Sequence, residues 1–142
     1  MKVRELMTTN VTTANVNSNL TDVARNMKDL NVGAIPVCDS NNQVVGILTD
    51  RDIAIRSVAD GTANRNRASD VMSKQLISVT PDTHAHEAAR IMAENQIRRL
   101  PVVQNGKIVG MLSIGDLATQ NIYINEAGDA LKNISLPSRP MK

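Results

Sequence analysis

The sequence predicts a mixed α/β (α+β) fold made of two copies of one βαββα unit, in the order strand, helix, strand, strand, helix. Three observations lead to this prediction. The 142-residue chain repeats itself after about 65 positions, each copy places a short amphipathic helix between β-prone runs, and Phe and Trp are absent. A core without large aromatic rings has to be built from Val, Ile, Leu, Met and Ala, which suits thin layers of strands and short helices.

The duplication appears when the sequence is aligned with itself. The first copy coincides with residues 65 positions later, and after one deletion in a turn the offset becomes 64. The identical pairs include Met7 with Met72, Ala24 with Ala89, Met27 with Met92, Pro36 with Pro101, Gly46 with Gly110 and Asp52 with Asp116. We therefore predict a first repeat at residues 1–60, a polar linker at 61–67, a second repeat at 68–124 and a C-terminal helix and tail at 125–142. Because about 60 residues bury too little surface to be stable alone, the copies are expected to pack on each other.

Each copy shows the same local pattern. A β-prone run at 11–16 or 76–80 precedes a helix, for which Ser18 or Asn19 and Asp82 or Thr83 are the candidate N-caps. Two strands follow, at 35–38 and 44–49 and again at 100–103 and 107–113, and a second helix closes each copy at 50–58 or 114–122. The apolar stripe of the first helix consists of Leu20, Val23, Ala24 and Met27 in the first copy and of Ala85, Ala88, Ala89 and Met92 in the second.

The composition narrows the class of partner. A net charge of +2 and an aromatic content of 1% argue against a nucleic-acid partner, which calls for a basic surface and stacking platforms. No run approaches the roughly 18 apolar residues of a membrane span, and the N-terminus shows no apolar signal region. The single cysteine, Cys38, has no partner for an internal disulfide. We expect a cytoplasmic protein without a membrane association.

A hydroxyl and a carboxylate recur where the last strand of each copy meets its last helix. Thr49 and Asp52 stand three residues apart in the first copy, and Ser113 and Asp116 do so in the second. A helix start offers free N–H groups to a phosphate, the hydroxyl adds a donor, and the carboxylate can accept bonds from the two hydroxyls of a ribose. The same spacing is also typical of a helix capping box, in which these side chains bond to the helix's own N–H groups. Gly46 and Gly110, which precede the motif, leave room for close approach beside the strand.

The ordered set of these motifs resembles the CBS domain, the module named after cystathionine β-synthase. The resemblance is carried by Val71-Met72-Ser73, Ile97-Arg98-Arg99-Leu100-Pro101-Val102 and Gly110 to Leu117, and by Leu6-Met7-Thr8, Val32 to Val37 and Gly46 to Ile53. It covers roughly nine-tenths of the chain and occurs twice. It implies a stand-alone tandem CBS pair, or Bateman module, with pseudo-twofold symmetry and two clefts that bind AMP, ADP, ATP, NAD(H) or S-adenosylmethionine, and an assembly as a homodimer.

Carried over position by position, the resemblance implies two crossed binding sites. The first combines Thr49 for the phosphate and Asp52 for the ribose with Ile77, Arg98, Arg99 and Pro101. The second combines Ser113 and Asp116 with Thr12, Val32, Gly33, Ala34 and Pro36. Because only the first set contains cations, we expect the Asp52 site to bind polyphosphate nucleotides more tightly.

Two functions follow, from different classes. The first is a regulatory module that senses an adenosine ligand and modulates an unidentified target protein or its own dimer. The alternative is an oligomerisation or interaction scaffold whose nucleotide clefts are vestigial. We expect no enzymatic activity and no required cofactor, because no nucleophile–base pair, P-loop or Cys-x-x-Cys pair is present. His84 and His86 are interpreted as surface residues, so no metal site is predicted.

Overall fold

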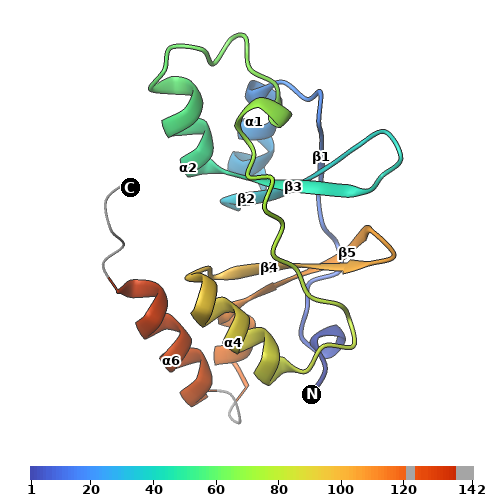
Figure 1. The fold of residues 1–142 in the computed structure, drawn as a ribbon, viewed down its shortest axis with the longest axis vertical. Coiled ribbons are helices and arrows are strands. Elements are labelled where there is room, and N and C mark those ends of the chain that lie inside the picture. Colours follow the sequence, from blue (N-terminus) through green and yellow to red (C-terminus); the bar gives the residue numbers. More distant parts are fainter. Residues whose placement is uncertain (121–123, 137–142) are drawn as a thin grey trace. The chain divides into compact units, whose positions relative to one another are not determined.

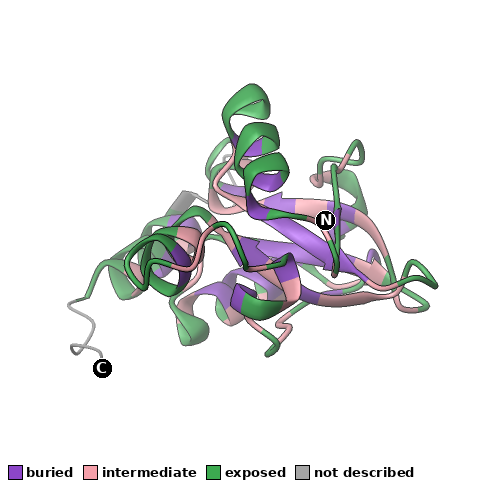
Figure 2. Ribbon diagram, turned by 90° about the horizontal axis from the view of Figure 1, so that it is seen from above, coloured by how far each residue is buried: buried purple, intermediate pink, exposed green. Residues whose placement is uncertain are grey.

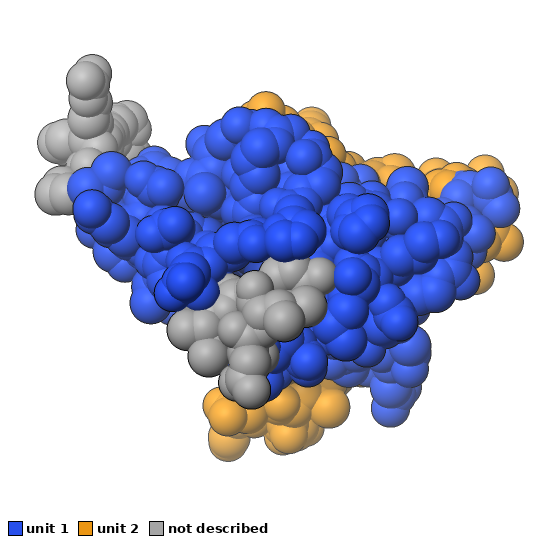
Figure 3. Space-filling view, turned by 90° about the horizontal axis from the view of Figure 1, so that it is seen from below, with its two compact units in different colours: residues 1–11, 77–105, 109–142 blue, residues 12–76, 106–108 orange. Residues whose placement is uncertain are grey.

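The computed structural model describes residues 1–120 and 124–136, and the chain forms two compact units (Figures 1 and 3). Unit 1 contains residues 1–11, 77–105 and 109–142, and unit 2 contains residues 12–76 and 106–108. Each unit has a hydrophobic cluster of its own, and the equivalent residues Leu112 and Leu48 are fully buried in the two clusters. The duplication predicted from the sequence is therefore present in the packing as well.

Unit 2 contains a three-stranded sheet with helices beside it. Strand β1 (Ala14–Asn15) pairs in parallel with β2 (Ala34–Cys38), which pairs antiparallel with β3 (Val44–Thr49). Helix α1 (Leu20–Leu30) separates β1 from β2. After β3 the chain continues into α2 (Asp50–Ile53) and a π-helical turn, η2 (Ala54–Val58). The short helix α3 (Ala68–Val71) completes the unit.

Unit 1 repeats this order around a two-stranded sheet. Helix α4 (Ala85–Asn95) precedes β4 (Arg99–Gln104) and β5 (Lys107–Ser113), and α5 (Ile114–Ala118) follows β5 directly. The expected strand at 76–80 is reduced to one parallel bridge between Val79 and Val102. The unit also holds a single turn of 3₁₀ helix, η1 (Val3–Glu5), and the C-terminal helix α6 (Ile124–Ser135). The prediction of a helix at 114–122 is confirmed for 114–118 and is wrong for 119–120, which form a turn, and residues 121–122 lie outside the described residues.

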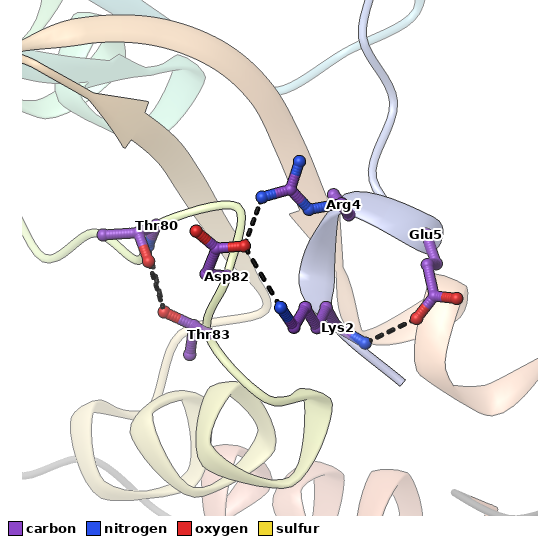
Figure 4. A network of polar contacts seen from close by, with 6 residues as sticks. All are labelled: Lys2, Arg4, Glu5, Thr80, Asp82 and Thr83. Carbon is purple, nitrogen blue, oxygen red and sulfur yellow. Dashed lines mark hydrogen bonds and ion pairs between the residues drawn. The ribbon is translucent and has the colours of Figure 1, made fainter.

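The two long helices begin differently. Asn19 caps α1, because its side chain accepts the N–H of Asp22, as one of the two candidates predicted. The prediction of Asp82 or Thr83 as the cap of α4 is wrong. The cap position is His84, which makes no capping bond with its side chain. Both predicted residues are engaged elsewhere, since Thr83 Oγ1 accepts the N–H of Thr80 at 3.1 Å and Asp82 pairs with the N-terminal segment (Figure 4).

The start of each repeat packs on the body of the other repeat. Residues 1–11 belong to unit 1, and residues 68–76 belong to unit 2. In unit 1 the N–H of Val3 donates to the carbonyl of Thr83 at 2.8 Å, and in unit 2 the N–H of Ala68 donates to Ser18 at 2.9 Å. These pairs are equivalent under the 65-residue shift. The duplicated chain has thus exchanged the two leading segments, and it has done so symmetrically.

Gly46 and Gly110 face the exchanged segments. A Cβ atom at Gly46 would lie 2.6 Å from the carbonyl oxygen of Ser73, and one at Gly110 would lie 2.5 Å from the sulfur of Met7. The space beside each strand, which we interpreted as room for a ligand, is filled by the chain itself. That interpretation is wrong, and the two glycines are needed for packing.

Burial confirms most of the predicted apolar stripes (Figure 2). Leu20, Val23 and Met27 are buried in α1, and all four predicted positions are buried in α4. The exception is Ala24, which is exposed, whereas its equivalent Ala89 is only 4% exposed. The difference arises because α6 lies along α4 and buries Ala127 and Ala130 there (Figure 1). Within residues 1–120 and 124–136, no helix is long and apolar enough to cross a membrane.

Candidate functional site

The first hydroxyl–carboxylate corner lies in unit 2, where β3 ends and α2 begins. Thr49 is the N-cap of α2, and its Oγ1 accepts the N–H of Asp52 at 3.0 Å. In return, Oδ2 of Asp52 accepts the N–H of Thr49 at 3.0 Å. The Asp52 side chain is 16% exposed, so the fold shelters most of it.

The second corner, in unit 1, has the same geometry. Oγ of Ser113 accepts the N–H of Asp116 at 3.1 Å, and Oδ2 of Asp116 accepts the N–H of Ser113 at 2.8 Å. Both hydroxyl–carboxylate pairs are therefore complete capping boxes, so the capping interpretation of the motif is confirmed.

Capping uses only part of the bonding capacity of these side chains. A capping hydroxyl accepts one bond and keeps its own hydrogen for donation, and a capping carboxylate keeps its second oxygen. Oδ1 of Asp52 is 4.0 Å from Nε of Arg56, and Oδ1 of Asp116 forms no hydrogen bond within the described residues. Each corner thus keeps one hydroxyl donor and one carboxylate oxygen that the cap does not use, and at Asp52 this oxygen faces Arg56. A phosphate oxygen can accept from such a donor, and a ribose hydroxyl can donate to such an oxygen.

The predicted strand residues of the first copy gather beside the corner of unit 2. Ala34 is paired with Thr49 across β2 and β3, and the carbonyl of Gly33 accepts the N–H of Asp50 at 3.0 Å. Val32 and Gly33 are half-buried just before β2, and Pro36 is buried within it. Thr12 is exposed and lies two residues before β1. Of these residues Ala34 and Pro36 lie within β2, whereas Thr12, Val32 and Gly33 precede the strands.

In the second copy, Arg98 connects the strand start to the corner of unit 1 in the same way. The carbonyl of Arg98 accepts the N–H of Ile114, the first residue of α5, at 2.9 Å. Arg98 and Arg99 are exposed at the start of β4, while Pro101 is buried and its carbonyl accepts the N–H of Val79 at 3.1 Å. Ile77 is half-buried against the core of the unit.

The structure therefore brings each corner together with the strand starts of its own repeat. The crossed sites implied by the resemblance combine residues of unit 1 with residues of unit 2, and this pairing stays a prediction. Asp50 is a residue that the sequence motif did not single out. Its signal was available in the duplication, because Asp50 stands where the second copy has Ile114.

Cys38, His84 and His86 were not assigned to a binding site from the sequence. Cys38 is buried at the end of β2, and this burial raises the pKa of its thiol. The rings of His84 and His86 stack with centroids 6.1 Å apart, and His86 pairs with Glu126 of α6. Among the described residues, no group of three or more His, Cys, Asp or Glu side chains could hold a metal ion.

Comparison with known proteins defines the family. The model of the CBS domain matches residues 3–58 and again residues 68–121. The chain is 44% identical over 133 residues to the CBS domain-containing protein YhcV of Bacillus subtilis strain 168, and the match covers 94% of each chain. The chain belongs to the CBS domain family and carries two CBS domains in tandem.

Solved structures agree with this assignment. A conserved CBS domain protein of unknown function from Thermoplasma acidophilum matches with a TM-score of 0.82 and 27% identity, over 94% of this chain and 75% of that one. The CBS domain pair of protein MJ0100, crystallised with 5′-methylthioadenosine and S-adenosyl-L-methionine, matches with a TM-score of 0.75 over 84% of this chain and 94% of that one. At 23% identity, the second likeness shows the fold alone.

Proposed function

We propose that this CBS pair is a regulatory, non-catalytic module that binds an adenosine-containing ligand and passes the signal to a target protein or to its own homodimer. The candidate ligands are AMP, ADP, ATP, NAD(H) and S-adenosylmethionine. We place this activity in the cytoplasm, with no required cofactor.

The observation that carries the proposal is the spare bonding capacity of the two corners. In each one the hydroxyl hydrogen of Thr49 or Ser113 and one oxygen of Asp52 or Asp116 remain available after capping. A hydroxyl donor suits a phosphate oxygen or a ribose oxygen, and a carboxylate oxygen suits a ribose hydroxyl. Each corner adjoins the start of a strand of its own repeat, half-buried at Gly33 and exposed at Arg98.

The scaffold alternative is favoured by a different observation. Both corners are already satisfied by their own capping bonds, so neither needs a ligand to explain its residues. Under this alternative the two carboxylates stabilise α2 and α5 and do nothing more. The two functions can be separated because they assign different roles to the second carboxylate oxygen.

The test uses a variant that keeps the cap and changes the ligand contact. In Asp52→Asn and Asp116→Asn the amide oxygen can still accept the capping N–H, but an NH₂ donor replaces the second acceptor oxygen. Titration calorimetry and thermal unfolding would be run with AMP, ADP, ATP, NADH and S-adenosylmethionine on the wild-type chain and on both variants. Asp129→Asn, on the exposed face of α6, is the matched control.

A binding module gives a clear signal in this experiment. A ligand at 100 times its Kd stabilises the folded state by about 2.7 kcal/mol, which is a rise in Tm of about 5–15 °C for a domain of this size. Each Asn variant should weaken binding at its own site at least tenfold, since bonds to charged groups are worth about 1.5–3 kcal/mol. Absence of heat and of any Tm shift with all five ligands would leave the scaffold function.

A further inference from the structure

The residues beside the two corners differ in charge, although they descend from one ancestral sequence: two arginines lie at the start of β4, whereas the start of β2 is uncharged and lies next to Asp50, the first residue of α2. We name Arg98, Arg99 and Ile114 the basic edge, and Gly33, Ala34 and Asp50 the acidic edge. The edges are equivalent position by position. In both, the backbone N–H of the first helical residue donates to the strand-start carbonyl, at 2.9 Å from Ile114 to Arg98 and at 3.0 Å from Asp50 to Gly33.

The carboxylate of Asp50 lies where the basic edge has the root of the Arg98 side chain. A Cβ atom at Gly33 would be 3.1 Å from Oδ2 of Asp50 and 3.5 Å from its Oδ1. The Asp50 side chain is thus turned back over Gly33, and Oδ1 also accepts the N–H of Arg51 at 2.8 Å. Where the basic edge has the side chain of Arg98, the acidic edge has Gly33 with the Asp50 carboxylate beside it.

Two arginines lie near the acidic edge, and neither stands at the position equivalent to Arg98 or Arg99. Arg56 is directed toward the carbonyl of Val71, to which its Nη1 donates at 3.3 Å, and its Nε is 4.0 Å from Asp52. Arg51 is exposed at the position where the second repeat has Gly115. In the second repeat, residues 98–118 contain a single acidic residue, Asp116 of the corner. The two arginines of the basic edge are exposed to solvent.

We propose that the two edges select adenosine ligands by charge. The basic edge takes an adenosine ligand that carries phosphate, because guanidinium groups pair with phosphate oxygens. The acidic edge excludes phosphate by repulsion and takes an adenosine ligand without it, such as an uncharged thioether or a cationic sulfonium nucleoside. This inference rests on the proposed function, and it holds whichever corner completes each edge, because the charge difference is a property of the edges.

The experiment exchanges the edges. In Gly33→Arg/Asp50→Ile the acidic edge receives two of the three residues of the basic edge, and the loss of the Asp50 carboxylate removes the group that an added Cβ would meet. In Arg98→Gly/Ile114→Asp the exchange runs the other way. Every introduced residue already occurs at the same place in the other repeat, so the backbone suits it. Titration calorimetry would measure the Kd of AMP and of 5′-methylthioadenosine for each protein at low and high salt.

The expected result is a change in the preference between the two ligands. The first exchange should raise AMP affinity at the weaker AMP site by about tenfold, and the second should lower it at the stronger site by a similar factor, with both effects reduced at high salt. Binding of 5′-methylthioadenosine should change by less than about threefold. Asp50→Asn, which removes only the charge, should give part of the first effect, and it carries the test if an exchanged protein does not fold.

Two outcomes would contradict different claims. If both ligands bind but the ratio of their affinities is the same in all proteins, charge selection by the edges is wrong and the proposed function stands. If neither ligand binds to the wild-type chain or to either exchanged protein, and ADP, ATP, NADH and S-adenosylmethionine give no heat either, the proposed function itself is overturned, together with this inference.

Discussion

The helical faces of the two repeats show how one ancestral unit has acquired two environments. In unit 1, α6 lies on α4 and α5, and Ala89 belongs to the same buried cluster as Ala127. In unit 2, Ala24 occupies the equivalent position on α1 and is exposed. Ile55 and Val58, on η2, are also exposed, by 41% and 61%. The strands and the first helices kept their roles after duplication, whereas the outer face diverged because only one repeat is followed by a covering helix.

Substitution of the equivalent alanines Ala24 and Ala89 should give the largest difference between the repeats in the loss of unfolding free energy. Ala89→Glu places a charge in the closely packed region beneath α6 and should destabilise the fold by about 3 kcal/mol. Ala24→Glu changes an exposed helix position and should stay within about 0.5 kcal/mol of the wild type. Urea unfolding of both variants measures these changes in the free energy of unfolding. Equal losses would mean that α1 is covered as α4 is, and would contradict the comparison.

Substitution of the equivalent glycines should give stability losses that differ less than those of the alanines, and the difference has a geometric cause. Gly46→Ala sets a methyl group 2.6 Å from a backbone oxygen of Ser73, which cannot move without displacing the exchanged segment. In Gly110→Ala the nearest atom is the sulfur of Met7, and the flexible thioether can turn away, although the carbonyl of Thr8 is then 3.0 Å distant. We expect losses of about 3 and about 1–2 kcal/mol, respectively, in urea unfolding.

A second substitution shows whether these losses come from the exchanged segments. Met7→Ala combined with Gly110→Ala should recover part of the loss caused by Gly110→Ala alone, because the sulfur no longer occupies the space. No such recovery is expected when Met72→Ala is combined with Gly46→Ala, since the backbone oxygen of Ser73 remains. Recovery in both pairs, or in neither, would contradict the assignment of the contacts.

The repeat order and the corner motifs were predictable because they depend on local pattern. Helical spacing identified the buried face of α4, and the duplication placed Asp52 and Asp116 at equivalent turns. The exchange of the leading segments was not predictable, because Val3 and Met7 show only that residues 1–11 need an apolar surface and not which repeat provides it. The exposure of Ala24 and the cap at His84 depended on such tertiary contacts too. The charge difference between Asp50 and Ile114 was readable, but its meaning required the position of the Asp50 carboxylate over Gly33.

The smallest expected effect concerns the polar contacts that hold the N-terminal segment on unit 1. Asp82 accepts a hydrogen bond from Arg4 and lies 3.4 Å from Nζ of Lys2, and the hydrogen bond and charge of Arg4 lower the pKa of Asp82 (Figure 4). Unit 2 has Asn17 at the equivalent place, so Asp82→Asn makes the two repeats alike. All three side chains are at least half exposed, so the contribution is small and is screened by salt.

The pH dependence of this contribution has a definite sign. Because the pKa of Asp82 is lower in the folded state, its contribution is complete above the unfolded pKa of about 3.9 and is lost as the pH falls through the folded value. Asp82→Asn should therefore be less stable than the wild type at pH 7, and the two should converge on acidification below about pH 4. The backbone amides of Val3 and Arg4, which donate to Thr83 and Pro81, should exchange hydrogen faster in the variant over the same pH range. A difference in exchange that persists unchanged at low pH, or that is insensitive to salt, would show that the charge of Asp82 does not hold this segment.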